Sequence, residues 1–171
     1  SINAVFAMPL FCRSADNLRD HRHVTALLSR SSVNANGITV RPTMAFDERG
    51  HTVNTTEYFA YGYRNSGLVP KRVIPSLDGF LGEGGTLYRP GYIYDPARTP
   101  APATAEGREP FCGLDFGTVS LKSGASTTFT VIMGITDKKP AAFLKQLNTP
   151  EKVDKALQAS SKAWQDIFNT Y

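Results

Sequence analysis

Alternating apolar and polar positions form the clearest pattern in this chain. Residues 38–46 alternate with a period of two, and residues 51–63 are rich in β-branched and aromatic side chains. The four residues between them, Asp47 to Gly50, are polar and end on glycine. A period of two is typical of strands, and a short polar loop ending on glycine is typical of the turn between two strands. The pattern therefore predicts an antiparallel hairpin.

Other segments extend the predicted β part. Residues 1–11 are apolar but lack a basic start and a small-residue cleavage site, which favours a strand over a secretion signal. Residues 114–121 and 126–135 indicate a second hairpin around the polar loop 122–125, with alternate residues from Phe129 to Ile135 on one apolar face. Five prolines among residues 90–110 predict a long surface loop between the hairpins.

Helical patterns lie near the start and at the end of the chain. Residues 16–30 place apolar side chains at helical spacing, although the segment HVTALL also suits a buried strand. Pro140 opens a predicted short helix over AAFLKQL. The last predicted helix has Thr149 as its N-cap, Pro150 at its first position and an apolar stripe that runs to Tyr171. Because that stripe needs cover, we expect more protein to follow it.

Composition supports a single folded domain. The 171 residues are 41% hydrophobic and 20% charged, which allows a packed core and excludes wholesale disorder. No apolar run approaches the length of a membrane span. The net charge of +4 is spread among acidic residues instead of forming a stripe, so we expect no nucleic-acid partner. Cys12 and Cys112 lie in apolar or glycine-rich surroundings, and we favour buried free thiols in a reducing, cytoplasmic setting over one disulfide.

The sequence contains no complete active site. His21-Arg22-His23 has the His-x-His spacing of a metal pair on a strand, but on a helix the two imidazoles point apart and nearby arginines repel a cation. Gly79 to Gly85 is rich in glycine without the Lys-Ser/Thr of a phosphate-binding loop. Two interpretations of this segment are equally supported, a tight turn and a surface of backbone amides beside a ligand or another domain. We interpret residues 47–49 as turn residues, and we expect no metal and no cofactor.

Four segments together carry a family resemblance. The first two are GFLGEGGTLYRP (79–90) and the long stretch from REPFCGLDFG at residue 108 to WQDIF at residue 168. They resemble the N-terminal β-sandwich of glycoside phosphorylases, the relatives of cellobiose phosphorylase in glycoside hydrolase family 94. DHRHVTALLSR (20–30) and RPTMAFDERGH (41–51) are similar to the branch with cellobionic acid phosphorylases and cyclic β-glucan synthases. The resemblance covers nearly the whole chain.

The resemblance implies a non-catalytic domain of an enzyme. The family's reaction is inverting phosphorolysis of a β-glucoside, in which phosphate attacks the anomeric carbon and an aspartic acid protonates the leaving oxygen. That acid and most phosphate ligands belong to a following (α/α) barrel, so no catalytic residue is assigned to this chain. Residues 1–138 would be an incomplete, galactose mutarotase-like supersandwich, and residues 139–171 a helical linker toward the barrel. Implied partners are the β-glucoside, inorganic phosphate, the catalytic domain and a second subunit through dimer contacts.

Polar residues beside the matched segments are the candidates for the rim of the active site. They are Arg19, His21, Arg22, Arg49, His51 and Glu83. Two other functions stay open. A stand-alone carbohydrate-binding module would stack sugars on Tyr88, Tyr92 and Tyr94. A structural or interaction domain would instead recruit a protein partner through the last helix.

Overall fold

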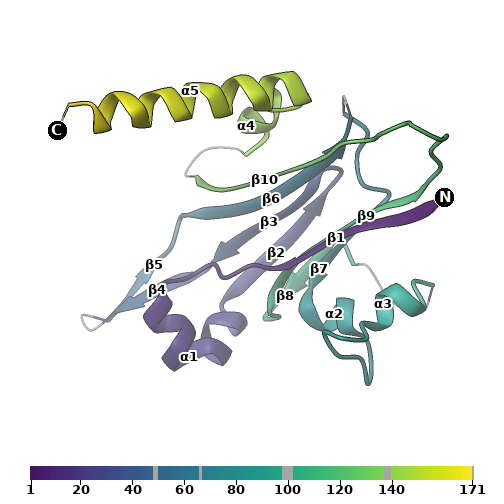
Figure 1. The fold of residues 1–171 in the computed structure, drawn as a ribbon. Coiled ribbons are helices and arrows are strands. Elements are labelled where there is room, and N and C mark those ends of the chain that lie inside the picture. Colours follow the sequence, from purple (N-terminus) through teal and green to yellow (C-terminus); the bar gives the residue numbers. More distant parts are fainter. Residues whose placement is uncertain (48–49, 66, 98–101, 137–139, 171) are drawn as a thin grey trace.

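The computed structural model describes residues 1–47, 50–65, 67–97, 102–136 and 140–170. Its first sheet has three antiparallel strands in the order β1 (Ile2–Pro9), β9 (Pro110–Val119) and β7 (Arg72–Ser76). Figure 1 shows β1 and β9 running side by side across the front of the molecule. The predicted first strand is thus confirmed, and β9 is the central strand of this sheet.

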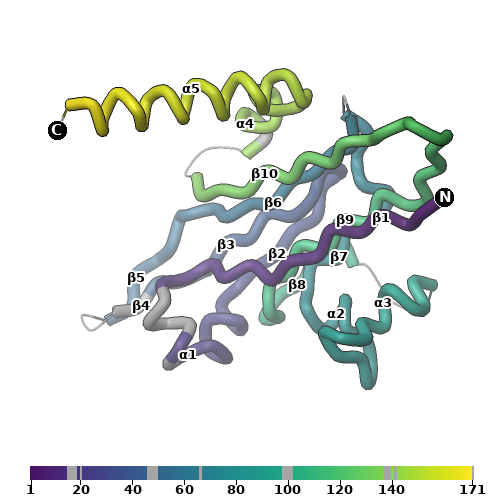
Figure 2. Tube along the Cα trace, in the orientation of Figure 1, coloured from purple at the N-terminus to yellow at the C-terminus, as the bar shows by residue number. Residues whose placement is uncertain are grey.

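The second sheet has five strands in the order β10 (Phe129–Thr136), β6 (Glu57–Arg64), β3 (Gly37–Pro42), β2 (Ser29–Asn34) and β8 (Thr104–Glu106). All its neighbouring strands are antiparallel. A separate two-stranded ribbon, β4 (Met44–Asp47) with β5 (Gly50–Val53), extends from one end of this sheet (Figure 2). The predicted mainly β chain of antiparallel sheets is therefore confirmed.

The two sheets share one apolar core. Ile38 and Val40 come from the five-stranded sheet, Cys112 and Leu114 come from the three-stranded sheet, and none of the four has any measurable exposure. Because side chains alternate along a strand, the other face of β9 carries a second set of apolar groups. The arrangement of two antiparallel sheets around a common core is consistent with a β-sandwich.

Two short helices cover the outer face of the three-stranded sheet. They are α2 (Leu77–Leu81) and α3 (Gly91–Tyr94). Phe80 from α2 and Tyr92 from α3 pack with Ile74 and Phe111 in a second buried cluster. The rings of Phe80 and Phe111 are 4.7 Å apart at their centroids. β9 is therefore buried on both faces along its first half.

The first predicted hairpin is confirmed. β4 pairs with β5 from Met44↔Val53 to Asp47↔Gly50, and β3 continues the same hairpin by pairing with β6. The two residues at its tip lie outside the described part of the chain. Gly50 has a φ of 119°, a conformation that favours glycine, which agrees with its place after the turn.

The second predicted hairpin is wrong, although both of its strands exist. β9 pairs with β1 and β7, whereas β10 pairs with β6 in the other sheet. Both edges of β9 are already occupied, so β10 fills the free edge beside β6. The segment between β9 and β10 crosses from one sheet to the other. Alternate residues of β10 do share a face, but Met133 and Ile135 on that face are 51% and 64% exposed.

Residues 16–30 and 90–110 combine confirmed and corrected predictions. The helix α1 (Ala15–Leu27) is present, with non-helical backbone angles at His21, and the strand β2 follows it. Residues 90–110 are not a plain surface loop, because they contain α3 and the strand β8, which pairs with β2. The sequence around β8 carries no local strand pattern, because this strand forms through its pairing with the distant β2.

The C-terminal helices begin as predicted. α4 (Ala141–Gln146) follows Pro140, and α5 (Pro150–Phe168) starts at the N-cap Thr149, whose hydroxyl accepts a hydrogen bond from the Lys152 amide. The predicted boundary between residues 138 and 139 lies outside the described residues. In the described part of the chain, no helix is both long and apolar enough to cross a membrane.

The shared core predicts a large cost for truncating its central strand. Leu114→Ala should lower the free energy of unfolding by about 2–5 kcal/mol, because it leaves a cavity between the two sheets. Leu87→Ala is the matched control, since Leu87 is 70% exposed and its truncation should change stability by less than about 0.5 kcal/mol. Urea unfolding of both variants measures the difference. Equal costs would contradict the core described here.

The two cysteines predict a stability that falls at high pH. Both are free and buried, as the sequence indicated, and burial raises the pKa of each thiol from 9.0 to about 12. The unfolded chain therefore loses thiol protons that the folded chain keeps, and stability should decline between pH 9 and about 12. At pH 8, a thiol reagent should react about a thousandfold more slowly with the folded chain than with the chain in urea. Fast labelling of the folded chain would contradict this burial.

Candidate functional site

The structure distributes the predicted rim residues over three elements. Arg19, His21 and Arg22 lie on α1, His51 lies on β5, and Glu83 lies in the turn after α2. Arg49 lies outside the described residues. α1 and the β4–β5 ribbon are at the same end of the molecule, whereas α2 covers the outer face of the three-stranded sheet (Figure 1). The candidates therefore do not form one cluster.

A pocket of about 290 Å³ separates α1 from the β4–β5 ribbon. Its polar lining comes from Arg13 and Thr25 on one side and from Thr52 and Asn54 on the other. Tyr58, on β6, closes the pocket next to Cys12. The pocket lies between two of the three elements that carry predicted candidates, but none of the five described candidates is part of its lining.

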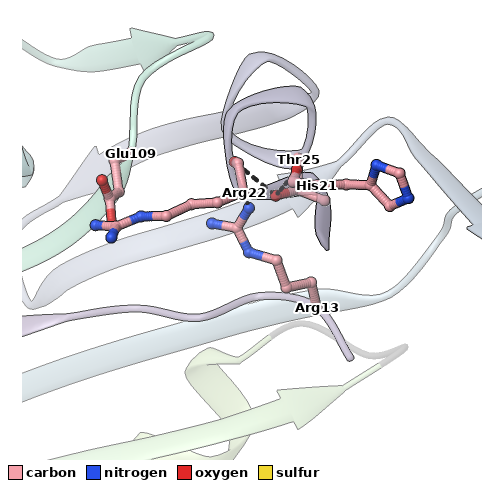
Figure 3. A network of polar contacts seen from close by, with 5 residues as sticks. All are labelled: Arg13, His21, Arg22, Thr25 and Glu109. Atoms are coloured by element: carbon pink, nitrogen blue, oxygen red, sulfur yellow. Dashed lines mark hydrogen bonds and ion pairs between the residues drawn. The ribbon is translucent and has the colours of Figure 1, made fainter. Parts of the chain in front are cut away.

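A polar network behind this pocket holds α1 against the start of β9 (Figure 3). The Arg22 guanidinium donates to Glu109, with 2.5 Å between Nη2 and Oε1. The Arg13 Nη1 donates to the backbone oxygen of Arg22 over 2.9 Å. One ion pair therefore joins residues 87 positions apart in the sequence, and Arg13 binds the backbone of the same helix.

The kink at His21 explains why α1 can accept these contacts. His21 has φ −136° and ψ 32°, which breaks the helical hydrogen-bond ladder. The hydroxyl of the buried Thr25 donates to the backbone oxygens of Arg22 and His21, at 2.8 and 3.1 Å. In Figure 3 the His21 imidazole points away from Arg22 and Glu109. His21 therefore contributes to this network through its backbone.

The electrostatics of the pocket favour an anion. Burial lowers the pKa of Arg13, while the nearby Glu109 carboxylate raises it, and the guanidinium remains charged. The Arg13 Nη2 is buried and has no hydrogen-bond partner. Burial raises the pKa of Tyr58, so its hydroxyl stays neutral. A partly buried cation with an unused donor binds a carboxylate or phosphate oxygen better than a neutral ligand.

The described residues provide no machinery for metal chemistry at this pocket. Within the described ranges, no group of three or more His, Cys, Asp or Glu side chains is placed to hold a metal ion. The high pKa of Cys12 leaves its thiol protonated and a poor nucleophile at neutral pH. The pocket can therefore bind an anion, and its residues do not assemble an acid–base pair.

Sequence reasoning missed Arg13 and Glu109. Glu109 stands at the start of the matched segment REPFCGLDFG, but nothing local marks it as the partner of an arginine on α1. Only the antiparallel pairing of β1 with β9 brings the end of β1 and the start of β9 together. A long-range ion pair of this kind leaves no periodic signal in one sequence.

The tyrosines of the carbohydrate-module interpretation separate into two environments. Tyr92 is 1% exposed and donates from its hydroxyl to Asp115 Oδ2 over 2.5 Å, so the expectation that it stacks on a sugar from solvent is wrong. Tyr88 is 99% exposed and Tyr94 is 64% exposed. The Arg89 guanidinium lies 5.1 Å from the ring centroid of Tyr94. Tyr88 and Tyr94 are therefore exposed, but Tyr92 does not extend them into a three-ring stacking surface.

Comparison with protein-family models and with curated protein sequences found no match to this chain.

The network predicts unequal roles for two neighbouring glutamates. Glu109→Gln should lower the free energy of unfolding by about 1 kcal/mol, because Arg22 loses its carboxylate partner and Arg13 loses a nearby negative charge. Glu106→Gln is the matched control. Glu106 is 69% exposed and 3.6 Å from Arg30, so its charge should contribute less than about 0.5 kcal/mol. Thermal unfolding at low salt compares the two variants, and equal effects would contradict the network.

Proposed function

We propose that this chain is a non-catalytic, carbohydrate-associated domain of an inverting glycoside phosphorylase acting on β-glucosides. In this proposal the β part is a portion of a larger supersandwich, and the C-terminal helices link it to a catalytic helical barrel. The proposal combines the sequence resemblance with one structural observation, which is the uncovered apolar stripe of α5. The buried free thiols Cys12 and Cys112 support a reducing, cytoplasmic setting for it.

The stripe on α5 carries the proposal. The helix is amphipathic over 19 residues, yet none of its described residues is buried. Leu157, Trp164, Ile167 and Phe168 are between 49% and 73% exposed. The ring centroids of Trp164 and Phe168 lie 6.2 Å apart. A stripe of this size on a stable helix is typical of a surface that packs against another part of the protein.

The link between this helix and the sheet is small and well defined. Phe143 of α4 stacks on Phe59 of β6 at 5.8 Å, and the Tyr63 hydroxyl donates to the backbone oxygen of Leu147. Lys152 then ties the first turn of α5 to Lys145 and Asn148. These contacts place α5 over β10 (Figure 1), and the side chains of its apolar stripe remain exposed. The five-stranded sheet therefore holds the helix through contacts at α4 and Leu147.

Apolar grooves between β1 and β10 support the larger sandwich. These two strands are edge strands of their sheets. One groove of about 460 Å³ is lined by residues that include Leu10, Tyr58 and Met133, and a second of about 510 Å³ includes Phe116 and Val131. Open apolar seams beside two free edges suit further strands that would complete the sandwich.

The only tryptophan of the chain lies in the stripe, which gives a direct test. In the chain alone, acrylamide should quench Trp164 efficiently, because the residue is 59% exposed. In the complete native polypeptide, its emission should shift to shorter wavelength and the quenching should fall. Unchanged quenching there would exclude packing through this face.

A pair of substitutions separates docking from folding. Phe168→Ser should leave the stability of the chain alone within about 0.5 kcal/mol, but should cost the complete polypeptide about 3 kcal/mol by opening the packed face. Gln165→Ser, outside the stripe, is the control and should affect neither. The enzymatic part is tested by phosphate-dependent release of sugar 1-phosphate from β-glucosides by the complete polypeptide. Activity without phosphate, or activity of this chain alone, would overturn the phosphorylase assignment.

A further inference from the structure

The outer face of the three-stranded sheet carries a second polar site, built by strand register. Arg72 of β7, Asp115 of β9 and Val5 of β1 are direct neighbours across the sheet. One step along, Asn3 of β1 lies opposite Thr118 of β9. Directly opposite residues on antiparallel strands point to the same face. A cation, a carboxylate, an amide and a hydroxyl therefore gather on one surface.

A β-bulge adjusts the spacing of these groups. Between the pairs Val5↔Asp115 and Asn3↔Thr118, β9 has two residues where β1 has one. The extra residue is accommodated at Gly117, whose φ of 70° favours glycine. The Gly117 amide donates to Asp115 Oδ1 over 2.6 Å. The bulge therefore both bends the strand and orients the carboxylate.

Helix α3 fixes the other oxygen of that carboxylate. The Tyr92 hydroxyl donates to Asp115 Oδ2 over 2.5 Å, and burial raises the pKa of Tyr92, so the hydroxyl stays a donor at neutral pH. The Arg72 guanidinium lies 5.4 Å from the ring centroid of Tyr92 and donates to the backbone oxygen of Pro96 over 2.5 Å. Each Asp115 oxygen keeps a further lone pair for a ligand.

These residues line a pocket of about 580 Å³, within the usual size range of small-ligand sites. Ile93 and Pro96 add apolar groups to a lining that also contains Asn3 and Thr118. The Thr118 hydroxyl donates to Asn3 Oδ1 over 2.7 Å, and the amide NH₂ of Asn3 makes no hydrogen bond within the described ranges.

Lys71 gives the pocket an unpaired positive charge. Its ammonium group forms no hydrogen bond or ion pair among the residues that the structure describes. Its stem runs beside the bulge, since a Cβ on Gly117 would lie 3.3 Å from the Lys71 Cδ. With Arg72 offset by Asp115, the lining has a net charge of +1 from Lys71. A flexible ammonium is a suitable point contact for a phosphate group.

We propose that this pocket binds a small polyhydroxylated anion of the sugar-phosphate type. The phosphate contacts Lys71, the hydroxyls contact Asp115 and the Asn3 amide, and the apolar face of the ring lies on Ile93 and Pro96. The site is independent of the proposed phosphorylase function, because it uses only the three-stranded sheet and α3. Its failure and the failure of the Trp164 experiment are therefore distinguishable.

Calorimetric titration of the chain with glucose 6-phosphate tests the assignment, with glucose and inorganic phosphate as separate probes. We expect glucose 6-phosphate to bind with a dissociation constant of about 1 mM, which weakens as salt is raised. Lys71→Gln should weaken binding about tenfold, because it removes a charge-assisted contact from an exposed position. Lys122→Gln is the matched control, because Lys122 is also exposed but lies outside the pocket, and it should bind like the parent chain.

Asp115→Asn supplies a second readout. It should weaken glucose 6-phosphate without weakening inorganic phosphate, since it acts on the sugar hydroxyls. Three results would overturn the proposal. These are no binding of glucose 6-phosphate at 10 times the expected dissociation constant (about 10 mM), equal affinity in Lys71→Gln and the parent chain, and equal affinity for inorganic phosphate alone.

Discussion

Strand β9 is covered on both faces, and the rest of the structure depends on this constraint. Its inner side chains, Cys112 and Leu114, meet the five-stranded sheet, while Phe111 packs under α2 and α3 on the outside. Gly113 makes this double packing possible, since a Cβ there would come within 2.9 Å of Ile74. A strand buried on both sides must also be paired on both edges, because unpaired backbone groups inside a protein are costly.

The central position of β9 also places two carboxylates, Glu109 and Asp115. Glu109 stands directly before β9 and pairs with Arg22 of α1, whereas Asp115 lies in the middle of β9 on the outer face. Asp115 is held within this central strand, and Glu109 stands one residue before it. The two pockets lie in different places on the molecule, and the lining of each contains more cationic side chains than carboxylates. Both are therefore suited to anions carrying hydrogen-bonding groups.

Helix α5, unlike β9, is stabilised by its own local interactions and not by packing on its neighbours. Its N-cap, its first-position proline and its acid in the first turn stabilise the helix locally. Glu151 has a pKa lowered by hydrogen bonds from the backbone and from Thr149, as expected at a helix start. Nevertheless, no residue of this helix is buried against the described part of the chain. A helix that is well formed and unpacked is best explained by a partner surface, which is the basis of the proposed function.

The sequence by itself determined the elements whose signals are local. The first hairpin, the first strand, α1 and the caps of α5 follow from alternation, turn residues and capping chemistry within a few positions. It could not determine which strands pair, because β9 and β10 each look like half of a hairpin until the edges of β9 are known to be occupied by β1 and β7. The same holds for the sites. Arg22 pairs with Glu109, and Arg72 lies opposite Asp115, only because distant strands pair in one register, and the tertiary structure decides that register.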